Sequence, residues 1–170
     1  AFAFGGHDMK IRSLDVPTKF LQAVIVLIGI GAVAFLLWEP HVEGRNENAT
    51  LLEIYFKDPF LAYAYLASIS FFVPLYQTFK VLGYAATNDI FSQAAVKSLR
   101  TIRLFLIALI GFVVVGEVFM ILPNADELPP PIFMGLLITF GSTVIATGAF
   151  VFERILQNAI GKISDNQLPV

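Results

Sequence analysis

Four long apolar runs, separated by short polar segments, dominate the chain. They span residues 20–38, 59–79, 104–122 and 132–152. At about 1.5 Å per helical residue, each run is long enough to cross a hydrocarbon layer about 30 Å thick. Because few polar residues interrupt them, the runs predict membrane-spanning helices rather than amphipathic helices of a soluble domain. The pattern therefore predicts an all-α, integral membrane, four-helix antiparallel bundle, with its first and last helices near each other.

A polar turn follows the second run, and a basic segment follows the turn. Gly83 is the predicted stop of the helix that enters the turn, and the next helix should start between Asn88 and Ser92. In the segment 91–103, apolar residues recur at three- and four-residue steps: Phe91, Ala95, Leu99 and Ile102. This spacing predicts an amphipathic elbow helix that runs on into the third span.

Three basic residues of the elbow helix lie mostly off its apolar stripe: Lys97, Arg100 and Arg103. Their place beside an apolar run is typical of residues that contact anionic lipid headgroups. A docking surface for a protein partner is the alternative. Three basic residues neutralise few phosphates compared with the six to ten contacts of typical nucleic-acid binders, so direct binding of nucleic acid is not expected.

The composition supports a protein of the lipid bilayer. Of the 170 residues, 57% are hydrophobic and only 14% are charged, whereas a soluble domain is closer to a quarter charged. The chain has no cysteine, which excludes disulfides and thiolate metal sites. The acidic residues of the loop after the first run match no standard metal motif. No metal or cofactor is therefore predicted. In the same loop, residues 50–56 are predicted to form a short amphipathic helix.

The basic residues are distributed unequally between the two ends of the predicted bundle. Nine of the 11 Lys and Arg residues fall on the side of the termini and the elbow, and only Arg45 and Lys57 fall on the other side. Because positive loops stay inside, both termini are expected in the cytoplasm. The expected parts are a cytoplasmic segment 1–19, a membrane domain 20–155 and a cytoplasmic tail 156–170. Met9-Lys10 is typical of a natural start, so residues 1–8 are either native or a vector-derived addition.

Few polar residues lie within the predicted spans. Glu117 is the one acid there; burying a carboxylate at membrane depth is costly, so a proton or cation relay, a partner contact and a purely structural role all stay open. Gln22 and Gln77 should share a depth near the inner edge, where a helix-to-helix amide bond is expected. Pro74 removes one backbone hydrogen bond and should kink the second span.

The elbow and the tail also carry residues that resemble a known family. These are Pro74-Leu-Tyr-Gln, the pattern Phe91-Ser-x-x-x-Val-Lys-x-Leu-Arg, Leu156-Gln157-Asn158-Ala159-Ile160 and the final six residues from Asp165 to Val170. They resemble the bacterial four-span family known as domain of unknown function 2975. Gln167 and Pro169 depart from the acidic residue and the threonine that this family tends to have there.

The resemblance implies a four-helix protein of the bacterial inner membrane. It also implies a partner, because genes of this family are often paired with a gene for a small helix–turn–helix regulator. It implies no activity, no cofactor and no catalytic residue.

Two functions follow as hypotheses. The first is a non-enzymatic regulatory or structural membrane component that binds a protein partner through its cytoplasmic elbow and tail. The alternative is a small channel or transporter that uses Glu117 and, because four helices leave little room for a pore, forms a homo-oligomer. An intramembrane enzyme is not expected, since the spans hold no paired acids, histidine cluster or nucleophile–base pair.

Overall fold

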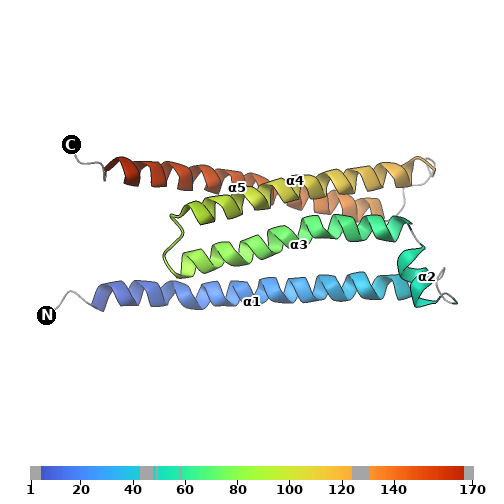
Figure 1. Ribbon diagram of the computed structural model, residues 1–170, viewed down its shortest axis with the longest axis horizontal. Helices are drawn as coiled ribbons and strands as arrows, with labels where there is room; N and C mark the ends of the chain where they lie inside the picture. Colours follow the sequence, from blue (N-terminus) through green and yellow to red (C-terminus); the bar gives the residue numbers. More distant parts are fainter. Residues whose placement is uncertain (1–4, 43–47, 49, 58, 124–130, 167–170) are drawn as a thin grey trace.

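The computed structural model describes residues 5–42, 48, 50–57, 59–123 and 131–166. They form five helices: α1 (Gly5–Val42), α2 (Leu51–Phe56), α3 (Pro59–Ala86), α4 (Gln93–Ile121) and α5 (Pro131–Asn166). The four long helices are apolar and long enough to cross a membrane. They run antiparallel, with both ends of the chain and the α3–α4 turn at one end of the molecule (Figure 1). The prediction of four long apolar helices is confirmed.

Two of the helices extend well beyond the apolar runs from which they were predicted. α1 begins at Gly5. Ahead of the apolar run, an ion pair of 3.3 Å between Lys19 and Asp15 supports the helix, as opposite charges four residues apart do. α5 continues for 14 residues past residue 152, to Asn166, which adds about 21 Å of helix. In Figure 1 both helices project past the α3–α4 turn.

The prediction that Gly83 ends the second span is wrong. α3 runs through Gly83 to Ala86, and the amide of Thr87 donates to the carbonyl of Gly83 at 3.1 Å. The chain turns instead at Asn88, whose φ of 57° lies in the left-handed region. Asparagine tolerates this conformation and ends helices as glycine does. Glycine costs only about 1 kcal/mol inside a helix, which packing readily offsets.

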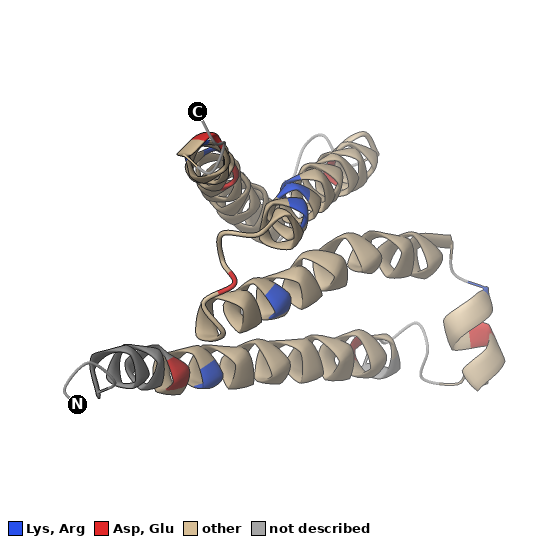
Figure 2. Cartoon of the chain, turned by 60° about the vertical axis from the view of Figure 1, so that its left-hand side comes forward, with Lys and Arg blue, Asp and Glu red and all other residues tan. Residues whose placement is uncertain are grey.

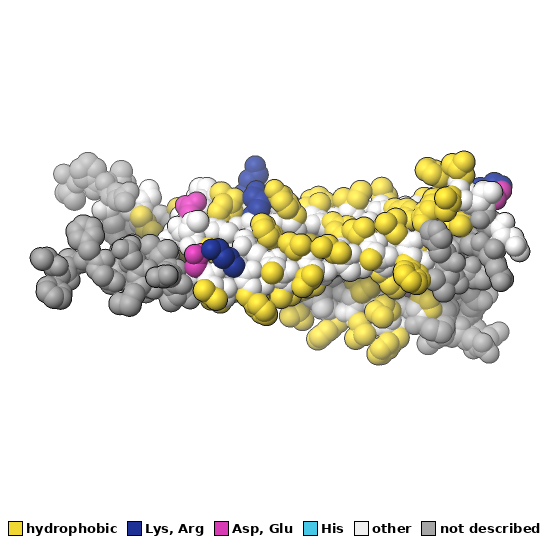
Figure 3. Space-filling model, turned by 90° about the horizontal axis from the view of Figure 1, so that it is seen from below, with side chains coloured by type: hydrophobic (Ala, Val, Ile, Leu, Met, Phe, Trp, Pro, Cys, Tyr) yellow, Lys and Arg dark blue, Asp and Glu magenta, His cyan; other side chains and the backbone are white. Residues whose placement is uncertain are grey.

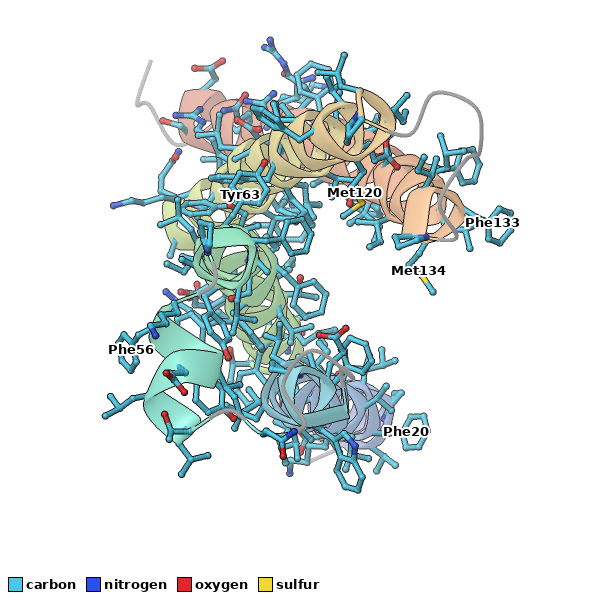
Figure 4. The ribbon with its side chains drawn as sticks, turned by 90° about the vertical axis from the view of Figure 1, so that its right-hand side faces the viewer. Phe20, Phe56, Tyr63, Met120, Phe133 and Met134 are labelled. Atoms are coloured by element: carbon cyan, nitrogen blue, oxygen red, sulfur yellow. The ribbon has the colours of Figure 1, made fainter. Side chains whose placement is uncertain are left out.

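The helices form an open curved layer rather than a closed bundle. α1 packs on α3, α3 on α4, and α4 on α5; Figures 2 and 4 show α1 and α5 at the two edges of the layer. The expectation that the first and last helices lie close together is therefore wrong. Lipid tails are as apolar as the side chains, so no hydrophobic force closes the ring. No residue in the most apolar stretch of α1 is buried within the protein.

Among the described helices, α4 and α5 share the most extensive contact. The α5 side of this interface follows alternating steps of three and four residues: Ile132, Gly135, Thr139, Ser142, Ala146, Ala149, Glu153 and Leu156. All but the half-buried Thr139 are buried. α4 carries a buried row with the same spacing, whose residues belong to the core shared with α5: Ala95, Leu99, Ile102, Leu106 and Leu109. We call these two rows the α4–α5 seam. Small residues let the backbones approach, as in many membrane helix pairs, and the repeat of about 3.5 residues is that of coiled coils.

The short helix α2 lies at the end of the molecule opposite the chain termini (Figure 1). Thr50 precedes it, and the Glu53 carboxylate accepts hydrogen bonds from the Thr50 amide at 3.2 Å and from Lys57 Nζ at 3.0 Å. The hydrogen bond from Lys57, followed by those from Thr50, lowers the pKa of the Glu53 carboxyl below its ordinary value. α2 exposes Leu51, Leu52 and Phe56, as expected of a helix at a membrane surface.

Apolar side chains cover the middle of the molecule. Seen from the α1 side, they form a band over the long helices, with charged side chains toward the two ends (Figure 3). Large side chains such as Phe20, Phe133 and Phe140 are about two-thirds exposed or more. Exposure on this scale would promote aggregation in water, whereas in a bilayer it is the surface that contacts lipid.

Candidate functional site

A buried glutamate joins α4 and α5 near the end that carries the chain termini. Glu153 is only 4% exposed. Arg100 Nε donates to its Oε1 at 2.9 Å, and Arg103 Nη2 lies 3.4 Å from its Oε2 without the geometry of a hydrogen bond. Gln157, one turn further along α5, donates to Oε1 at 3.5 Å. We call these four residues the Glu153 cluster.

The local sequence explains how the cluster forms. Glu153 occupies a seam position, four residues after Ala149 and three before Leu156, so its side chain must face α4. α4 begins just ahead of the arginines, where the Ser92 hydroxyl accepts a hydrogen bond from the Ala95 amide at 3.2 Å and caps the helix. Removing a carboxylate from water costs several kcal/mol, which only close ion pairs offset. The two arginines are therefore required by the buried acid.

A second arginine contact lies next to the cluster. The Arg103 guanidinium is 4.9 Å from the centre of the Phe150 ring, and that of Arg154 is 5.3 Å from it. Both distances are within the range of cation–π attraction. Lys97 is exposed on α4. The basic residues of α4 lie in the part nearest the α3–α4 turn (Figure 2).

Glu117 lies at the other end of the α4–α5 seam. It is half-buried, and its Oε1 is enclosed without a hydrogen-bond partner among the described residues, as is the hydroxyl of Thr139. The side chain rests directly on Gly135, where a Cβ would come within 2.0 Å of Oε1. Gly135 and Thr139 are one turn apart on α5. The Glu117 carboxylate thus lies in the space that a side chain at position 135 would fill, so a larger residue there must displace it.

Tyr63 connects α3 to the neighbourhood of Glu117. Its hydroxyl donates to the backbone carbonyl of Phe112, and its ring meets the Phe112 ring edge-on with centres 5.6 Å apart. A Cβ at Gly116 would lie 3.5 Å from this ring, an ordinary van der Waals distance, so the ring packs close to the α4 backbone at this point. Figure 4 shows Tyr63 on the side of α3 that faces α4.

The remaining predicted residues lie on α1 and α3. Gln22 donates to the backbone carbonyl of Phe79 at 3.1 Å, so the expected bond between helices exists, but it goes to the backbone. Gln77 is half-buried and takes no part in it. Pro74 is buried inside the continuous α3, and its carbonyl accepts a hydrogen bond from the Thr78 hydroxyl at 2.8 Å.

Sequence reasoning placed Lys97, Arg100 and Arg103 correctly on one amphipathic helix but missed Glu153, the residue on which two of them converge. The signal was present in the spacing, because Glu153 continues the row of Ser142, Ala146 and Ala149. Gly135 was also missed, as were Gln157 and Phe150. Within the described part of the chain, no group of three or more His, Cys, Asp or Glu residues could hold a metal ion.

Replacing Glu153 by glutamine should destabilise the protein. Removing the carboxylate leaves Arg103 without its partner in a site where its side chain is only 24% exposed. We expect a loss of about 2–4 kcal/mol, less than for a fully enclosed pair because Arg100 is partly solvated. The free energy of unfolding in mixed micelles would measure it, with Lys57→Gln at an exposed pair as the control. Equal stability of Glu153→Gln and wild type would contradict the assignment.

The contact between Glu117 and Gly135 can be tested by a pair of substitutions. Gly135→Ala should destabilise the protein by about 1–3 kcal/mol, because its methyl group must displace the carboxylate. In a Glu117→Ala background the same change should be neutral or stabilising, since alanine favours helix over glycine. Thermal unfolding of the four variants in detergent measures this. The same loss in both backgrounds would show that Glu117 is not the obstacle.

Comparison with known proteins identifies the family of this chain. Residues 46–170, which include α2 to α5, match the family described as "Protein of unknown function (DUF2975)". The chain is 35% identical over 155 residues to the "Uncharacterized membrane protein YoaS" of Bacillus subtilis (strain 168), which covers 90% of this chain and 97% of that protein. No solved structure matches. The chain is thus a multi-pass membrane protein, and it belongs to the DUF2975 family.

Proposed function

We propose that this protein is a non-enzymatic regulatory or structural component of the bacterial inner membrane, with both termini in the cytoplasm. It binds a protein partner through the elbow at the start of α4 and the projecting end of α5. The excess of Lys and Arg on this side supports the orientation. The resemblance of the elbow and tail to their family supports a role for these segments in recognition.

The observation that carries the proposal is that the seam row of α5 continues beyond the level at which α4 begins. After Leu156 the three- and four-residue steps continue to Ile160 and Ile163. Ile160 packs against the core, whereas Ile163 is 48% exposed among polar neighbours. α4 begins at Gln93 and extends no further in that direction. The projecting turn of α5 therefore presents an apolar position to a partner helix of matching spacing.

The partner's chemistry follows from this surface. A helix with one or two large apolar residues at coiled-coil spacing would continue the seam. Acidic groups on that helix would complement Lys97 and Lys162. The small helix–turn–helix regulator implied by the family resemblance is the candidate to test first.

The absence of cysteine permits one experiment for orientation and binding. A single cysteine is introduced at Gly161, where a side chain meets nothing within 4 Å, or at the exposed Leu52 of α2. An impermeant maleimide should label Leu52→Cys in intact cells and Gly161→Cys only after permeabilisation. A cysteine crosslinker should then trap a partner at the Gly161 position only, and Ile163→Asp should abolish that adduct.

Labelling of Gly161→Cys from outside the cell would refute the orientation. An adduct that persists in Ile163→Asp, or that forms equally at Leu52→Cys, would refute binding through the end of α5.

A second candidate function rests on the enclosed, unpartnered Oε1 of Glu117 and the Thr139 hydroxyl. Such a pair within a span could take up a proton or a cation in a small oligomeric channel or transporter. Purified protein in liposomes should then conduct protons or Na⁺, and Glu117→Gln should abolish the flux. No flux at any pH, or equal flux in Glu117→Gln, would refute this candidate.

A further inference from the structure

Positive charge exceeds negative charge where α4 and α5 approach the membrane surface. Lys97, Arg100, Arg103 and Arg154 contribute four cations, and Glu153 contributes the one carboxylate that pairs with any of them in the described chain. Three positive charges are therefore left without an internal counterion. Arg100 and Arg103 each form an ion pair with Glu153, whereas Lys97 and Arg154 form none with a described residue.

Two of these cations converge on one side chain. Arg103 and Arg154 come from different helices, yet both guanidinium groups lie close to the Phe150 ring, at 4.9 and 5.3 Å from its centre. Arg154 has no carboxylate partner among the described residues. A guanidinium has five N–H donors in a planar fork, so this arginine keeps its donors for an external acceptor. Two like charges held beside one ring would be stabilised by an anion.

An apolar groove leads from Arg103 and Phe150 toward the middle of the membrane. It has a volume of about 260 Å³ and is lined by Arg103, Ile107, Ile110, Thr143, Ala146, Thr147 and Phe150. The hydroxyls of Thr143 and Thr147 donate to backbone carbonyls of their own helix, both at 2.8 Å. Their donors are thus already used, and the walls offer mainly methyl groups and aliphatic chains. The groove is polar only at the end where Arg103 lies.

The lining of the groove favours an apolar occupant, because apart from Arg103 its walls offer aliphatic and aromatic surface, and the two threonine hydroxyls are already bonded to their own helix. A hydrocarbon chain is slender and needs no hydrogen-bond partner. An apolar channel with a cationic mouth at the membrane surface is complementary to a molecule with an anionic head and an acyl tail.

We propose that this surface is a binding site for one anionic phospholipid. The phosphate lies against Arg103 and Arg154 beside Phe150, with Lys97 at the rim, and one acyl chain lies in the groove between α4 and α5. The inference needs only that the helices span a bilayer, so it is independent of the orientation and the protein partner proposed above. It also accounts for Arg154, to which the Glu153 cluster gives no role.

The test uses the full chain, purified in a non-ionic detergent and examined by native mass spectrometry with added lipid. Phosphatidylglycerol should bind with one molecule retained at low lipid excess, and phosphatidylcholine with the same acyl chains should bind more weakly. Arg154→Gln should weaken phosphatidylglycerol binding about five- to tenfold, the loss expected for one charged hydrogen-bonding group at a membrane surface. Arg154→Lys should weaken it less, because the charge is kept.

Matched controls separate this site from diffuse attraction. Lys162→Gln removes the same charge two turns further along α5 and should leave binding within about twofold of wild type, since no groove residue lies there. Thr147→Phe fills the groove and should weaken binding, whereas Ile145→Phe, at an exposed position outside the groove, should not. Arg154 and Thr147 are both exposed, so thermal unfolding of these variants should match wild type.

Four results would overturn the proposal. Equal losses in Arg154→Gln and Lys162→Gln would show a diffuse electrostatic effect. Unchanged binding in Thr147→Phe would show that no acyl chain enters the groove. Glycerol phosphate binding as tightly as phosphatidylglycerol would identify a site for soluble anions. Lipid-free dimers that dissociate in Thr147→Phe would identify a second copy of the chain as the occupant.

Discussion

Close approach of α4 and α5 is the constraint on which the rest of the structure depends. In lipid, helices gain nothing by hiding apolar surface from one another, so association requires van der Waals packing between backbones. Small residues along α5, among them Gly135, Ser142, Ala146 and Ala149, provide that packing. The other faces of α5 carry large side chains, such as Phe133 and Phe140, that remain exposed. One face is thus specialised for protein and the rest for lipid, which also explains why the helices form an open layer.

The seam has an acid near each end, and each acid is accommodated differently. Glu153 is buried but meets two arginines, so its charge is balanced locally. Within the described part of the chain, Glu117 meets no cation; its carboxylate lies over Gly135, and one of its oxygens has no hydrogen-bond partner. A buried polar atom without a partner is costly and is usually retained for a reason. Glu153 thus joins α4 and α5 through its ion pairs, whereas Glu117 is an enclosed acid without such a pair among the described residues.

Much of the fold could be predicted because hydrophobic length is a strong signal and each apolar run produced one long helix. Helix ends were harder: Gly83 is a typical stop signal, but α3, packed on α1 and α4, continues past it to Ala86, and the chain turns at Asn88. The order of packing was also missed, because which helices touch depends on the size of residues along a face rather than on hydrophobicity. The basic residues of the elbow were found by their spacing. Glu153 was not found, because the predicted fourth span ends at residue 152. Its position on the packed face is visible only when the row from Ser142 is continued beyond that span.

α5 is one unbroken rod from Pro131 to Asn166, about 54 Å long at the usual rise per residue. Glu153, which meets Arg100 and Arg103, and Gly135, which meets Glu117, therefore belong to the same rigid helix. A twist of the rod about its own axis would swing Glu153 away from its arginines and, in the same movement, carry Gly135 from beneath Glu117. Rotation of the projecting turns near Ile163 would thus be transmitted through the continuous helix to the Glu117–Gly135 contact, near the other face of the bilayer.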